Sequence, residues 1–109
     1  MNVDEFARKF GYETICMPDP ERKVSGGYAG DLLSWVMGRA SENSAWVTVM
    51  GNVNAVAVAV LADISCIVLA ENSTLDDDAK IKADEHDIAI LQTEIPQFEL
   101  CVDIDKLIK

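Results

Sequence analysis

Basic residues are scarce in this sequence. Nine Lys and Arg residues stand against nineteen Asp and Glu residues, which gives a formal net charge of -10 over 109 residues. Nucleic-acid affinity rests on Lys and Arg side chains that neutralise phosphates, so this composition argues against a nucleic-acid partner. It argues equally against binding to an anionic membrane surface. Solubility is the simplest meaning of the acidic surface, and it is favoured over an acidic docking role.

Cysteine and histidine are too few and too scattered for a structural metal site. Cys16, Cys66 and Cys101 are widely spaced and form no CxxC pair, and His86 is the single histidine. We therefore expect no metal and no cofactor. Free core thiols in a reducing cytosol are the simplest account of the cysteines. His86 follows Asp84 and Glu85 in a charged segment, and a solvated helix-end residue is favoured over a catalytic one.

Long uninterrupted apolar runs are also missing. The longest apolar run contains Asp63 and is interrupted by turn residues, so no membrane span is expected. The first ten residues include acids and no long apolar region, unlike a signal peptide. Half of the residues are hydrophobic and 6% are aromatic, which predicts one domain over residues 1–109 with an aliphatic core. A cytoplasmic protein is the expectation.

The stretch from Trp46 to Glu71 organises the rest of the chain. Residues 46–50 are uncharged and rich in β-branched side chains, as in a strand buried on both faces, and residues 64–70 form a similar run. The segment 53–61 between them can be interpreted as an alternating strand or as a helix that is apolar on every side. Its alanines, the capping residue Asn52 and the length needed for a parallel crossover favour the helix.

Helices and strands alternate along the remaining chain. We expect helices over 3–10, 30–37, 75–86 and from Pro96 onwards, and strands over 13–17, 23–28 and 88–91. In the second helix, the inward stripe is expected to be Leu32, Leu33, Val36 and Met37. Trp35 falls off that stripe, so it is half exposed or packs against a second copy. This alternation predicts an α/β domain of three layers with a mostly parallel sheet.

Ligands of such sheets bind beyond the carboxyl ends of the strands. Three loops are selected on that ground, over residues 28–31, 51–54 and 71–74. The candidate ligand-binding residues are Tyr28, Asp31, Gly51, Asn52 and Asn54. If Gly51 and Asn52 open a helix, its free amides could hold a small anion. A capped turn without a ligand is the favoured alternative, and for Asp31 a helix cap is favoured over a general base.

Three segments carry a resemblance to a known family. They are GGYAGDLLSWVMG from Gly26 to Gly38, VTVMGNVNAVAVAVLADISCIVLAE after it, and ILQTEIPQFELC from Ile90 to Cys101. Together they resemble the DRTGG-domain family, and more closely its small stand-alone members related to HPr kinase. The family's naming motif would fall near residues 51–54, where this chain has GNVN. The resemblance implies a parallel α/β domain like the amino-terminal domain of HPr kinase.

The resemblance further implies a regulatory role and dimer contacts, because such domains sit beside CBS modules and kinase domains in larger proteins. It carries no kinase chemistry, since none of the six glycines is followed by the Lys of a P-loop. We therefore expect a non-enzymatic regulatory or ligand-sensing module, a homodimer that binds a small anionic ligand or nucleotide. Trp35, Met37 and the strand at Gly26 and Gly27 are the expected dimer contacts. The alternatives are an accessory subunit or scaffold of a redox or signalling complex, and a small enzyme acting on an anionic substrate.

Overall fold

The computed structural model describes residues 1–108, which form five helices and five strands. In chain order these are α1 (Val3–Phe10), β1 (Glu13–Cys16), β2 (Gly26–Ala29), α2 (Leu33–Arg39), β3 (Ser44–Thr48), α3 (Val53–Leu61), β4 (Cys66–Leu69), α4 (Asp77–Glu85), β5 (Ala89–Gln92) and α5 (Gln97–Ile108). The run of Val and Ala in α3 is helical, and the Asn52 side chain caps it by accepting a hydrogen bond from the Ala55 amide at 2.9 Å.

The five strands form one sheet in the order β1-β5-β4-β3-β2. Four neighbouring strands are parallel, and β1 alone pairs antiparallel, on β5. The expected mostly parallel α/β sheet is therefore confirmed. Every residue of β3 and β4 is buried, because helices cover both faces of these central strands.

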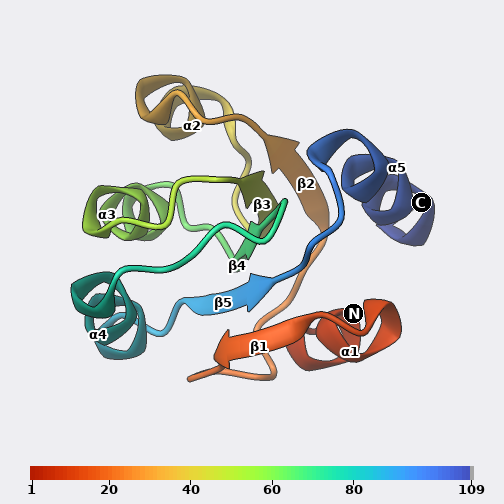
Figure 1. The fold of residues 1–109 in the computed structure, drawn as a ribbon, viewed down its shortest axis with the longest axis horizontal. Coiled ribbons are helices and arrows are strands. Elements are labelled where there is room, and N and C mark those ends of the chain that lie inside the picture. The colour runs from red at the N-terminus through yellow and green to blue at the C-terminus, as the bar shows by residue number, and fades with distance from the viewer. Residues whose placement is uncertain (109) are drawn as a thin grey trace.

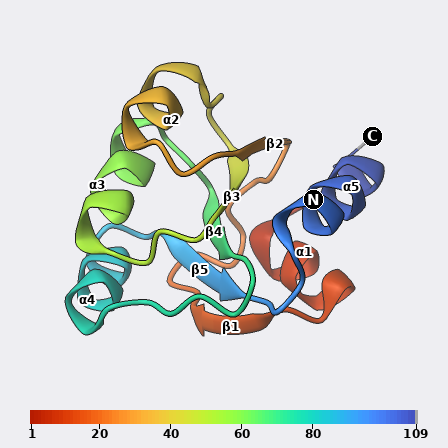
Figure 2. The same ribbon diagram turned by 45° about the horizontal axis from the view of Figure 1, so that its top comes forward.

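Helices lie on both faces of the sheet and complete the three layers. Figure 1 shows α2, α3 and α4 stacked along one face and α1 with α5 on the other, and the turned view in Figure 2 agrees. Each face has its own core. Trp46, Ile67 and Ile90 pack under the three-helix layer, whereas Val47, Val68 and Leu91 pack under the two-helix layer. Successive strand residues point to opposite faces, which explains this division.

The two edges of the sheet differ in construction. At one edge, β1 carries the exposed Glu13 and an irregularity in its pairing between Thr14 and Cys16. At the other edge, β2 has the sequence GGYA, with no charged residue and no proline. The expected strand over 23–28 is shorter and later in the structure, because only residues from Gly26 onwards pair with β3.

Helix α2 departs most from expectation. It begins at Leu33 rather than Gly30, and Leu32 occupies the N-cap position without a side-chain capping bond. Of the four residues expected to face the core, only Val36 is buried, while Leu32 and Met37 are exposed. Leu32 precedes the helix and therefore cannot share its inward face. Trp35 is 52% exposed, which agrees with the first of its two expected placements. The Arg39 guanidinium carbon lies 3.7 Å from the centre of the Trp35 ring.

Helix α4 is also shorter than expected. It runs from Asp77 to Glu85 rather than from 75 to 86, with Asp76 at the N-cap and His86 at the C-cap. The acidic first turn predicted from Asp76 and Asp77 is present, which suits the positive end of the helix dipole. The helix buries only Ala79 and Ala83, so its charged residues face outward, as their density in the sequence indicated.

Candidate functional site

Asp31 joins three separate segments at the carboxyl ends of β2 and β3. Its Oδ1 atom accepts hydrogen bonds from the Thr48 hydroxyl at 2.7 Å and from the Val49 amide at 3.0 Å. The Gln97 side-chain amide also donates to the Asp31 carboxylate, at 3.3 and 3.4 Å. Asp31 therefore does not cap α2, as sequence favoured, but links β2 to the end of β3 and the start of α5.

These contacts alter the acidity of Asp31. Partial burial of the carboxyl opposes its ionisation, but the hydrogen bonds from Thr48, Val49 and Gln97 favour the charged form and together lower the pKa below its ordinary value of 3.8. Asp31 is consequently an ionised acceptor at neutral pH. A carboxylate already held by three donors is a poor general base, because its proton affinity is reduced.

The turn that opens α3 is tightly covered. The Gly51 carbonyl accepts a hydrogen bond from the Asp76 amide at 2.8 Å. A Cβ atom built on Gly51 would lie 1.9 Å from the Thr74 carbonyl oxygen, so the loop before α4 rests directly on this glycine. Only glycine fits under that loop. The side of the turn that faces Thr74 is closed to a ligand.

The other side of the turn leaves two candidate groups. The Asn52 side chain and backbone carbonyl both accept from the Ala55 amide. The amides of Val53 and Asn54, in the first turn of α3, are the groups that an anion could use, because first-turn amides have no partner within the helix. Asn54 is exposed at this position. The geometry allows an anion contact at these amides, while the ionised Asp31 carboxylate at the same edge of the sheet has the same charge as an anion and would repel it.

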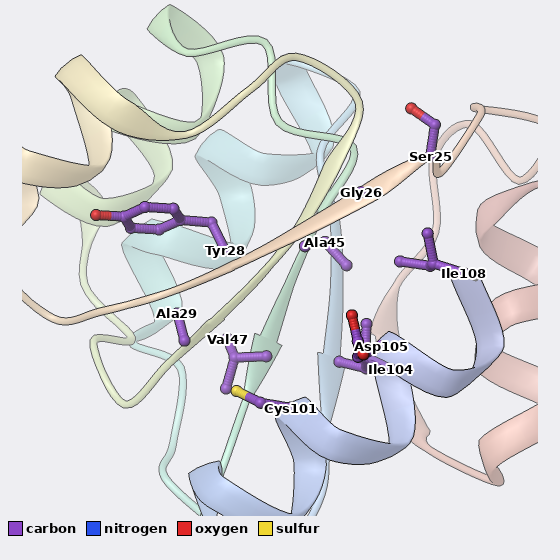
Figure 3. A pocket seen from close by; sticks show the side chains of 11 residues that line it. Ser25, Gly26, Tyr28, Ala29, Ala45, Val47, Cys101, Ile104, Asp105 and Ile108 are labelled. Carbon is purple, nitrogen blue, oxygen red and sulfur yellow. The ribbon is translucent and has the colours of Figure 1, made fainter.

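The five residues selected from sequence are thus only partly brought together. Asp31 bonds to the backbone two residues before Gly51, so these two share one edge of the sheet with Asn52 and Asn54. Tyr28 lies earlier in β2, and its side chain is half buried in the core under the three-helix layer. It points to the opposite face of the sheet from α5 (Figure 3).

Sequence reasoning missed Thr48 and Gln97. Thr48 is completely buried inside an apolar strand, and a buried hydroxyl needs a hydrogen-bond partner. That polar residue within WVTVM was a usable signal for a partner such as Asp31. Gln97 carried no such signal, because 66 positions separate it from Asp31 and only the path of α5 brings the two together.

A cavity lies beside the edge strand β2. It has a volume of about 600 Å³ and is bounded by β2 and α5. Ala29 and Val47 line it on the strand side, and Cys101 and Ile104 line it from α5 (Figure 3). Gly27 of β2 lines it as well. Small residues on β2 and β3 leave this space open. Burial raises the pKa of the Cys101 thiol, which makes it a weak nucleophile.

Within residues 1–108, no three His, Cys, Asp or Glu side chains lie together as a metal site would require. None of the helices in the same range combines the length and apolarity needed to cross a membrane. Cys16 and Cys66 are buried free thiols, and burial raises their pKa values to about 11 and about 12.

Comparison with known proteins supports the fold. No protein-family model and no curated protein sequence matches the chain. Among solved structures, it is similar to the regulatory region of a pyrophosphatase from Clostridium perfringens, which contains CBS and DRTGG domains and was crystallised with its activator, diadenosine tetraphosphate. The TM-score is 0.69 at 11% sequence identity, and the match covers 90% of this chain and 43% of that one. The fold is therefore DRTGG-like, while the likeness to HPr kinase stays a prediction.

Proposed function

We propose that this chain is a non-enzymatic regulatory module that senses a small anionic ligand and acts as a homodimer. The observation that carries the proposal is the fold, which is shared with the regulatory region of the Clostridium perfringens pyrophosphatase. That protein binds a nucleotide activator, so a nucleotide or a smaller phosphate is the ligand class to test. An enzyme at the same strand ends is the less favoured alternative, because the Asp31 carboxylate is already hydrogen-bonded to Thr48 and Val49 and Gly51 is covered by Thr74.

The proposed ligand contacts are the first turn of α3, at Asn52, Val53 and Asn54, with Tyr28 within β2 and Asp31 just after that strand. Isothermal titration of the protein with diadenosine tetraphosphate, ATP and inorganic phosphate tests this site. We expect heat with at least one of the three, and a weaker response after Asn54→Ala. Null heats for wild type and Asn54→Ala alike would end the proposal of a ligand at this turn.

The proposed dimer forms across the free edge of β2. An edge strand presents unpaired backbone groups, and β2 lacks the charges and prolines that usually protect such an edge. Large apolar residues are exposed on the helices on either side of the sheet: Trp35 and Met37 on α2, with Leu32 at its N-cap, and Phe98 and Val102 on α5. Phe98 is 80% exposed, more than any other large apolar side chain described here. Strand pairing between two copies would cover these side chains.

Analytical ultracentrifugation tests the dimer. We expect a dimer at micromolar concentration, and a monomer after Ala29→Lys, because a lysine on an edge strand disfavours pairing. The matched control is Thr14→Lys, which places the same charge at an exposed position of the opposite edge strand β1. A monomeric wild-type protein, or a dimer that survives Ala29→Lys, would contradict this interface. Purification with a stable unlike partner would instead favour the accessory-subunit alternative.

A further inference from the structure

The outward surface of α3 is apolar, although a surface helix normally carries polar residues there. No charged residue occurs between Asn52 and Ala62. Val60 is 38% exposed and Leu61 is 71% exposed. An amphipathic helix on the outside of a domain turns its polar face to water. The sequence of α3 therefore fits a helix whose outer face is covered by something apolar.

A groove runs along this surface between α3 and α4, which pack side by side in the three-helix layer (Figure 1). Its volume is about 390 Å³, within the range of roughly 300–1,000 Å³ that small-molecule sites occupy. Val56, Ala57, Val60 and Leu61 line it from α3, and Lys82 and His86 line it from α4. One wall is thus wholly aliphatic and the other carries nitrogen groups.

The charge of the lining selects the kind of occupant. The chain has nineteen acidic residues, but none of them lines this groove. Lys82 and His86 are four positions apart on α4, so they share one face of the helix. Lys82 is paired with Glu85 at 3.5 Å, and both side chains are about half exposed. An exposed pair of this kind contributes little stability, so a ligand carboxylate can compete for the ammonium group.

We propose that the groove between α3 and α4 binds an aliphatic carboxylate. The hydrocarbon chain lies along Val56, Val60 and Leu61, and the carboxylate meets the ammonium group of Lys82 and the imidazole of His86. The nine residues of α3 span about 13 Å at the usual rise of a helix, which suits an alkyl chain of medium length. The groove reaches Val53 at the start of α3, next to the proposed anion site, but its Lys82 and His86 end and the alkyl contacts at Val60 and Leu61 lie away from that turn and from the β2 edge.

A matched series of amphiphiles tests the proposal by NMR titration of backbone amides in the full chain. The probes are octanoate, octan-1-ol and octyltrimethylammonium, which share a chain length and differ in charge. We expect octanoate to shift the amides of residues 56–61 and 82–86 and to bind about threefold to fivefold more tightly than octan-1-ol. Equal binding of all three probes, or shifts confined to other residues, would overturn the proposal.

Two variants and one control locate the contacts. Lys82→Gln should remove the preference for octanoate over octan-1-ol, and Val60→Asp should weaken octanoate binding at least about tenfold, because it places a carboxylate against the alkyl chain. Thr14→Asp, at an exposed position of β1 outside both proposed interfaces, should leave binding unchanged. If Val60→Asp instead turned a dimer into a monomer, the groove would belong to a second copy and the proposal would fall. An absence of heat in the nucleotide titrations would contradict the anion site at the start of α3 and would leave the aliphatic-carboxylate site unaffected.

Discussion

The carboxyl ends of the strands and the edge beside β2 show opposite ways of using small and polar residues. At the strand ends, Asp31 is held by Thr48, Val49 and Gln97, and Gly51 lies directly under the Thr74 carbonyl. Beside β2, Gly27 borders the cavity, and a Cβ atom built on it would reach only van der Waals contact, 3.4 Å from Cγ2 of Ile104. The glycine at the strand end is required by close packing, whereas the glycine at the edge leaves a surface free.

Replacing Gly51 should have the largest effect on stability. In Gly51→Ala the new methyl group would lie 1.9 Å from the Thr74 oxygen, so the backbone of one segment must move. We expect the free energy of unfolding to fall by about 3 kcal/mol or more, measured by urea denaturation. The control is Gly38→Ala in α2, where nothing lies within 4 Å and the helix should gain up to about 1 kcal/mol. Equal effects of the two substitutions would contradict the close packing at Gly51.

Removing the charge of Asp31 should have the next largest effect. Hydrogen bonds to charged groups contribute about 1.5–3 kcal/mol, and exposure of Asp31 reduces this, so Asp31→Asn should cost about 1–2 kcal/mol at pH 7. Because the folded-state pKa is lowered, this stability is fully present above the ordinary pKa of 3.8 and is lost as the pH falls through the lower folded value. The difference between the two proteins should therefore shrink in acid.

Urea denaturation at a series of pH values from 7 to 2 measures that difference. Glu42→Gln, in the exposed turn before β3, controls for the loss of one negative charge from an acidic chain. A difference between wild type and Asp31→Asn that stayed constant down to pH 2 would rule out the charged network as its cause.

Tyr12 gives a third, smaller contrast, because its polar group is buried without the partners that Asp31 has. Its hydroxyl oxygen finds no hydrogen-bond partner in the described part of the chain, while its ring packs with Phe6 and Phe10. Tyr12→Phe should raise the free energy of unfolding by about 1 kcal/mol, as thermal denaturation would show. A lower melting temperature for Tyr12→Phe would indicate a hydrogen bond through bound water.

Burial raises the pKa of the same phenol, with smaller contributions from the Asp103 charge and the Cys66 and Cys101 thiols. The unfolded chain therefore ionises Tyr12 first, and stability should decline as the pH rises above the ordinary pKa of 10.0. Tyr12→Phe should lose less stability than wild type over that alkaline range.

Replacing Gly27 should have the smallest effect and completes the comparison of the two glycines. In Gly27→Ala the methyl group would lie 3.4 Å from Cγ2 of Ile104, a contact that a small shift of that side chain relieves. We expect the free energy of unfolding to change by less than about 0.5 kcal/mol in urea, because the strand also gains from the loss of glycine flexibility. If Gly27→Ala lost as much unfolding free energy as Gly51→Ala, the cavity beside β2 would have no room for the added methyl group.

Much of the fold was predictable from local sequence. The helix Val3–Phe10 has the predicted bounds and ends at Gly11 with a φ of 67°, a conformation that glycine adopts without strain. The buried strands β3 and β4, and the Asn52 cap between them, were likewise predicted from apolar runs and one turn. These features depend on neighbours in the chain, so local patterns suffice.

The candidate site was predicted less well, because its contacts join distant segments. Asp31 was expected to cap α2. Its carboxylate instead accepts hydrogen bonds from Thr48 and Val49, which lie next to Asp31 only because β2 pairs with β3. The predicted inward face of α2 was also partly wrong. A start three residues later than expected leaves Leu32 outside the helix and Met37 exposed.

By itself, the sequence determined the alternation of helices and strands, the aliphatic core and the acidic charge, because each depends on composition or on near neighbours. Only the tertiary structure decided which edge of the sheet is open, which glycine is covered and which carboxylate is held by donors. Those outcomes depend on the order β1-β5-β4-β3-β2 and on where α5 and the Thr74 loop come to rest. They arise from contacts between residues far apart in the chain, which no local pattern records.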